Sequence, residues 1–167
     1  MSPRDPAAAP MTLPLHDPDD AALARTLGLA GLIPFVLLAA LLWLVDLDLQ
    51  PWVAIAMTAY AALIIAFLGG IHWGIGWLGG RHEQGQPHRP HHQRNHFLWG
   101  VVPSLLAWPG LLMPAFAGLA WLGFLLILCY LADRTLYRRA GLEAWLTLRF
   151  RLSSIAALSC FIGAGAL

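Results

Sequence analysis

His72 is the residue whose type and position suggest chemistry most directly. It stands in the run FLGGIHWG, inside a long stretch without formal charge. An ionisable side chain in such a stretch needs a partner and is a candidate functional residue, because an imidazole can exchange protons near neutral pH or bind a metal. Trp73 and Trp77 beside it are typical of the membrane interface. An interfacial histidine that is simply hydrogen-bonded is therefore the alternative interpretation.

A second group of histidines follows in residues 81–96, which read RHEQGQPHRPHHQRNH. His88, His92 and His96 are spaced by four, which on a helix would place three imidazoles on one face, as a transition-metal site requires. Pro87 and Pro90 oppose a helix over the first half, and a histidine-rich tract can equally be a solvated loop. We therefore expect no metal site, and keep these three histidines as the alternative.

Charged residues reappear at the end of the fourth apolar run, where Asp133 and Arg134 stand together. An ion pair between Asp133 and a following arginine is expected to contribute little if it is exposed. We expect the arginines around the next segment to contact anionic lipid head groups, each worth about 1 kcal/mol near the surface. These are Arg138, Arg139, Arg149 and Arg151. Arginines that only anchor an interfacial helix are the alternative. The candidate functional residues are His72, Trp73, Gly70, Gly74, Asp133 and Arg134.

The usual catalytic motifs are missing. The sequence holds no G-x-S-x-G, Walker loop, H-E-x-x-H or dinucleotide fingerprint. Cys129 and Cys160 lie in apolar runs and are interpreted as small apolar fillers. We therefore expect neither an enzyme nor a cofactor.

The composition indicates whether the protein is soluble or lies in a membrane. Of 167 residues, 59% are hydrophobic and 11% are charged, and the formal net charge is +1. Soluble domains are about 25% charged, and a small body exposes too much surface for so few charges to keep in water. This excludes an ordinary soluble enzyme, a disordered chain and a nucleic-acid binder with a basic face. It indicates an integral membrane protein with the lipid bilayer as its partner.

The apolar runs predict an all-α fold with five transmembrane helices in a compact bundle. A crossing needs about 20 apolar residues, and we place the spans at about 28–45, 52–80, 97–113, 115–132 and 148–167. We expect residues 1–16 to form a mobile tail and residues 17–167 to form a single transmembrane domain. A histidine-rich loop (81–96) follows the second span, and an arginine-rich loop (133–151) with a short tilted helix precedes the fifth. The first helix should begin near Pro18, and the third and fourth should form a tight hairpin at Pro114.

The arginines predict the orientation. All ten basic residues are arginine, and with five spans all of them fall on one side, which the excess of positive charge on cytoplasmic segments identifies as the cytoplasm. The N-terminus is then cytoplasmic and the C-terminus lies on the opposite side. We expect a multi-pass protein of the bacterial inner membrane.

The second span carries small residues at every fourth position. They are Ala54, Thr58, Ala62, Ala66, Gly70 and Gly74. Such a row lets another helix approach closely, so we expect Ala62, Ala66, Gly70 and Gly74 to serve helix packing, within the bundle or with another membrane protein. The alternative is a bendable end over residues 69–80 that lines a cavity. By helical angle, His72 points away from Gly70 and Gly74.

Three segments resemble the transmembrane-protein-69-like family, a domain of unknown function. They are LGLAGLIPF (27–35), AYAALIIAFLGGIHWG (59–74) and, less sharply, WGVVPSLLAW (99–108). The best-fitting positions are Gly31, Pro34, Phe35, Phe67, Gly69, Gly70, Trp73 and Gly74. The resemblance implies a multi-pass fold in bacterial inner membranes or animal mitochondria, without an assigned reaction. Relatives can carry arginine at the position of His72, which implies a shared basic or hydrogen-bonding role there.

Together these features predict a non-enzymatic membrane protein, an accessory or assembly partner of a larger complex. The alternative is a small-solute transporter or channel, or a lipid-binding protein, with a cavity near His72. A membrane-embedded enzyme is least favoured, because the sequence offers only isolated acid and base groups. No nucleic acid is expected as a partner.

Overall fold

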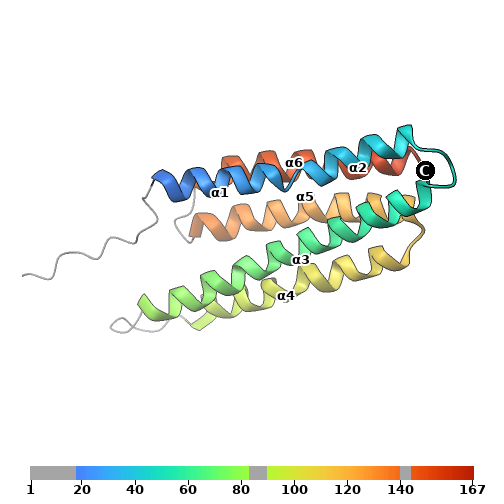
Figure 1. The fold of residues 1–167 in the computed structure, drawn as a ribbon. Helices are drawn as coiled ribbons and strands as arrows, with labels where there is room; N and C mark the ends of the chain where they lie inside the picture. Colours follow the sequence, from blue (N-terminus) through green and yellow to red (C-terminus); the bar gives the residue numbers. More distant parts are fainter. Residues whose placement is uncertain (1–17, 83–89, 140–143) are drawn as a thin grey trace, which may run out of the picture.

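The computed structural model describes residues 18–82, 90–139 and 144–167, and these residues are all-helical apart from short turns (Figure 1). The elements are α1 (Pro18–Ala30), α2 (Ile33–Leu44), α3 (Gln50–His82), α4 (Pro90–Leu112), α5 (Ala115–Arg139) and α6 (Ala144–Gly165). The predicted all-α fold is confirmed. The predicted tail at 1–16 lies outside the described residues.

The helices run side by side as an elongated up-and-down bundle. Figure 1 shows the start of α1, the end of α3, the start of α4, the end of α5 and the start of α6 at one end of the bundle, and the C-terminus at the other. The central element is α3, because it packs against α2, α4, α5 and α6. The apolar core lies where the inner faces of these helices meet.

The first apolar run is a broken helix. It begins at Pro18, as predicted, but α1 ends at Ala30 and α2 starts at Ile33. Pro34 has no backbone N–H to offer the carbonyl of Ala30, so the helical ladder cannot continue unbroken. The phenol of Tyr60 in α3 donates a hydrogen bond of 2.8 Å to the carbonyl of Gly31, which satisfies a backbone group that lipid could not.

The hairpin at Pro114 is confirmed, since α4 ends at Leu112 and α5 begins at Ala115. Glycines allow its tight closure. A Cβ on Gly118 would collide with the carbonyl oxygen of Gly110, so any side chain there would push the two helices apart.

Two helices extend further than the sequence indicated. Residues 133–151 were expected to form a loop with a short tilted helix, but α5 continues to Arg139 and α6 runs unbroken from Ala144. The charged residues in this region do not end the helices, because two of them are buried against each other, as described below. The predicted loop at 81–96 is likewise shortened, since α3 reaches His82 and α4 starts at Pro90; its residues 83–89 lie outside the described part.

Among the residues that the structure describes, four segments are long and apolar enough to cross a membrane: Ala21–Leu44, Gln50–Trp77, Ala115–Tyr137 and Trp145–Gly165. The first of them combines α1 and α2. Helix α4 lies along α3 but begins with polar residues, so its apolar part is short. The fifth span and the orientation of the termini therefore stay predictions.

The row of small residues on α3 does not stay on one face. At 3.6 residues per turn, a row of every fourth residue winds by about 40° per step. Ala54, Thr58 and Ala62 are accordingly buried, whereas Gly70 and Gly74 are exposed and an added Cβ on either would meet no atom within 4 Å. Within the described residues, the expected packing role of Gly70 and Gly74 is not seen.

The glycine that permits close packing is the neighbour, Gly69. A Cβ there would lie 2.5 Å from the carbonyl oxygen of Gly100 in α4. Helices in lipid associate through such close backbone approaches, so Gly69 and Gly100 set the distance between α3 and α4.

Substitution by alanine should therefore change the free energy of unfolding differently at the adjacent Gly69 and Gly70. Gly69→Ala should lower the free energy of unfolding by about 1–3 kcal/mol, because the methyl group overpacks against a backbone carbonyl. Gly70→Ala should be neutral or stabilise by up to about 1 kcal/mol, because alanine favours the helix and the space is open. Unfolding of both variants in the same detergent micelles measures the difference, and equal effects would contradict this packing.

Candidate functional site

Three ionisable side chains from three helices meet inside the bundle. His72 of α3, Asp133 of α5 and Arg149 of α6 are only 0%, 1% and 8% exposed. The Nε2 of His72 lies 2.7 Å from Oδ1 of Asp133, and the Nη2 of Arg149 lies 2.7 Å from Oδ2 of Asp133. We call these three residues the ionic cluster.

Asp133 is the centre of the ionic cluster. Its Oδ1 accepts a hydrogen bond from the imidazole of His72, and its Oδ2 accepts two from Arg149, from Nε at 2.9 Å and from Nη2. The Nη1 of Arg149 donates a further bond of 3.1 Å to the hydroxyl of Ser153, one turn later in α6. The carboxylate is therefore bonded on both oxygens and joins three helices.

Helical periodicity brings these residues inward. In α5, Asp133 follows the buried Leu122, Leu126 and Cys129 on one face, and in α6, Arg149 precedes the buried Ser153, Ala156 and Cys160. Spacings of three and four residues keep side chains on one side of a helix. Both charges thus continue the stripes that form the apolar core, a signal that the sequence carried.

The other nitrogen of His72 faces a fourth helix. Its Nδ1 lies 3.2 Å from Nδ1 of His96 in α4, and its ring lies 5.5 Å from the ring of Tyr137. Asp133 accepts a hydrogen bond from Nε2–H of His72. The Nδ1 of a neutral His72 then has no proton and accepts a hydrogen bond from His96, whereas the Nδ1 of a protonated His72 donates one to His96. His72 thus connects the ionic cluster to α4.

The opposite charges of Asp133 and Arg149 are paired inside the bundle. Removing a carboxylate and a guanidinium from water is costly unless they are paired and their remaining hydrogen bonds are made. In the described residues, every buried side-chain nitrogen and oxygen has a hydrogen-bonding partner. The ionic cluster therefore links three helices, and its polar atoms are bonded to one another, to His96 and to Ser153.

The other residues that the sequence indicated as candidates lie in different places in the structure. Arg149 was expected among lipid head groups but is turned into the core, where Asp133 holds it. Arg134, next to Asp133, is exposed and lies outside the ionic cluster. Trp73 is partly exposed, and its indole N–H donates to the carbonyl of Phe97 at 3.1 Å. Arg151 is exposed; the side chains of Arg138 and Arg139 lie outside the described part.

The histidines expected as an alternative metal site are not gathered in the part of the chain that can be described. His96 faces His72, as stated above, while His88 and the side chain of His92 lie outside the described residues. Among described side chains there is no group of three or more His, Cys, Asp or Glu that could hold a metal ion.

Neutralising one member of the ion pair should cost more than neutralising both. Asp133→Asn or Arg149→Gln leaves a buried charge uncompensated, and each should lower the free energy of unfolding by about 3–5 kcal/mol. The double variant removes both charges and should lose less than the sum of the two. A double-mutant cycle in one detergent measures this coupling; additive losses would contradict a direct interaction.

His72 should matter through its hydrogen bond. His72→Leu removes the donor to Oδ1 of Asp133 and should destabilise the fold by about 1–3 kcal/mol, whereas His72→Gln retains an N–H donor and should recover part of that loss. Thermal unfolding of the two variants is the comparison. A leucine variant as stable as the unchanged protein would refute this role.

Comparison with known proteins agrees with the membrane-protein character of the chain. A family model described as "Protein of unknown function (DUF3429)" matches residues 21–165. Transmembrane protein 69 of Xenopus tropicalis is 44% identical over 89 residues, which is 53% of this chain and 32% of that protein. The chain thus aligns with about a third of that relative's length. No solved structure matches the chain. Since the family model covers most of the chain, including α3, α5 and α6, the protein belongs to the DUF3429 family of membrane proteins of unknown function.

Proposed function

We propose that this protein is a non-enzymatic accessory component of a membrane complex, which receives a helix of another membrane protein on the outer face of α3. The observation that carries the proposal is the open space beside Gly70 and Gly74, which lie on a membrane-spanning helix and touch no neighbour on that side.

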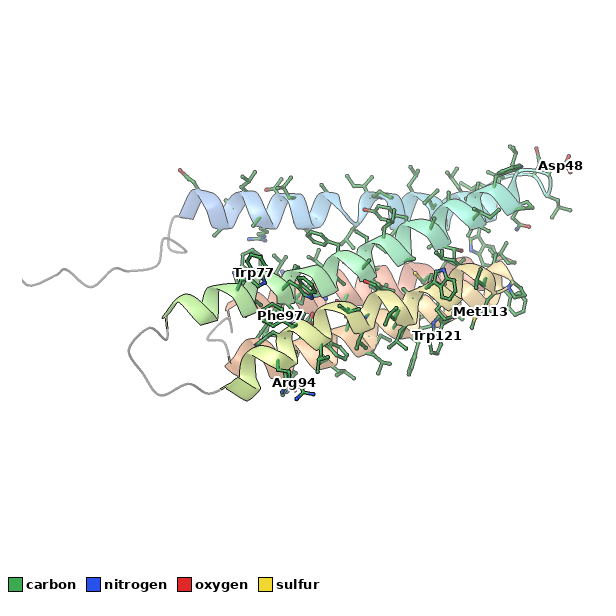
Figure 2. The ribbon with its side chains drawn as sticks, turned by 90° about the horizontal axis from the view of Figure 1, so that it is seen from below. Asp48, Trp77, Arg94, Phe97, Met113 and Trp121 are labelled. Atoms are coloured by element: carbon green, nitrogen blue, oxygen red, sulfur yellow. The ribbon has the colours of Figure 1, made fainter. Side chains whose placement is uncertain are left out.

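Large apolar side chains flank these glycines. Phe67 and Trp77 lie on the same face of α3 and are each 66% exposed. Figure 2 shows Trp77 projecting from α3 on the side away from α4. Small residues between large ones form a depression into which a second helix can pack closely, and such packing drives helix association in lipid.

A groove between α3 and α4 continues this surface toward the middle of the bundle. Its volume is about 320 Å³. The lining residues are Ala59, Ala62, Leu63, Ala66, Ser104, Ala107, Trp108 and Leu111. It is apolar apart from the Ser104 hydroxyl, which suits a transmembrane helix better than a polar substrate. Ala62 and Ala66 thus contribute to an outer surface as well as to the bundle.

The interior also supports a non-enzymatic role. The acid and base groups of the ionic cluster bind one another. Of five surface grooves in the described residues, none is lined by His72 or Asp133, whereas Arg149 lines one beside Gly28 and Leu152. A transporter, channel or lipid-binding protein that works at His72 would need a cavity reaching it. The accessory role needs only the outer face of α3.

Site-specific photocrosslinking in native membranes tests the proposal. A benzophenone amino acid in place of Phe67 should give one discrete adduct with another protein, and Gly70→Leu with Gly74→Leu should abolish it by filling the depression. The same probe at the exposed Phe116 of α5 serves as the control.

An added Cβ at Gly70 or Gly74 meets open space on the outer face of α3, so the unfolding temperature of that variant should not fall and should report intact folding. Identical adducts from Phe67 and Phe116, or an adduct composed of two copies of this chain, would overturn the accessory role.

A further inference from the structure

A second surface feature lies between α1 and α6, on the other side of the bundle from α4. It is a groove of about 310 Å³. Its lining residues are Ala21 and Arg25 of α1 and Trp145, Thr147, Leu148 and Arg151 of α6. Two cations from different helices thus line one groove.

Neither of these arginines is bonded to another described side chain. Both are exposed, and neither makes an ion pair or side-chain hydrogen bond within residues 18–82, 90–139 and 144–167. A guanidinium binds phosphate through a planar fork of N–H donors, and the hydroxyl of Thr147 is a further donor in the groove. Asp19, in the first turn of α1, does not line it.

The position of the groove indicates the source of the phosphate. Ala21 and Trp145 are the first residues of two membrane-spanning segments, so the groove lies where the apolar part of the bundle begins. Lipid head groups lie at this level, and tryptophan is enriched there. Leu148 and Ala21 supply apolar surface beside the arginines, as the junction of head group and acyl chain requires.

Helical geometry explains why Arg151 takes this role and Arg149 does not. Side chains two residues apart on a helix point in directions that differ by about 200° around the helix axis. Arg149 therefore points into the bundle at Asp133, while Arg151 points outward at the groove.

We infer that the groove between α1 and α6 is a binding site for the phosphate of an anionic phospholipid, held by Arg25 and Arg151. The site is independent of the α3 face proposed above, since it lies on different helices.

Lipid titration of the full chain in neutral-detergent micelles tests the site. Phosphatidylglycerol should raise the unfolding temperature at much lower mole fractions than phosphatidylcholine does. Arg25→Gln with Arg151→Gln should weaken the response to phosphatidylglycerol about 30-fold, as expected for two arginine contacts. The matched control is Arg94→Gln with Arg134→Gln, which removes the same charge from exposed positions on α4 and α5 and should leave the response intact.

Each other outcome overturns the inference. An equal loss in both double variants would show attraction by general positive charge, and no loss in either would show that the groove is not used. Stabilisation by inorganic phosphate equal to that by phosphatidylglycerol would show a simple anion site. The unfolding temperature in phosphatidylcholine alone reports whether each variant is folded.

Discussion

A carboxylate inside an apolar bundle must be paired, and much of this structure follows from that requirement. Asp133 is nearly inaccessible and is surrounded by helices that are themselves long and apolar enough to cross a membrane. Its negative charge draws Arg149 inward from α6 and orients His72 on α3. These bonds connect α5 to α6 and to α3 inside the bundle.

The ionic cluster also determines which surfaces are left for other molecules. The polar atoms of His72, Asp133 and Arg149 bond to one another, to His96 and to Ser153, so these groups serve to hold the helices together. The outer surface then divides into an apolar face on α3, with open space at Gly70 and Gly74, and a cationic groove at the start of α1 and α6. One surface suits a helix within the membrane and the other suits a head group at its edge.

Much of the fold could be predicted from the sequence, and the exceptions have physical reasons. Apolar run lengths were enough for the helical class and for the hairpin at Pro114. Helical angles placed His72 opposite Gly70 and Gly74, but only the structure shows that this is the inner side of α3. Charge at the end of an apolar run suggested a loop at residues 133–151, yet Asp133 and Arg149 lie on the buried stripes of continuous helices. Burial of a charge depends on a partner from another helix, which composition along one segment does not reveal. Counting every fourth residue on α3 likewise ignored the winding of that row around the helix, so Gly70 was assigned the close contact that Gly69 makes.

The most direct test of the buried ionic cluster is the rate at which the Nε2 proton of His72, which is bonded to Asp133, exchanges with solvent. In ¹⁵N-histidine-labelled protein, NMR should show one Nε2–H signal that exchanges with solvent far more slowly than a free imidazole does, and Asp133→Asn should shift that signal strongly. A His72 ring proton that exchanges as fast as a free imidazole, or that ignores the substitution at residue 133, would contradict the account.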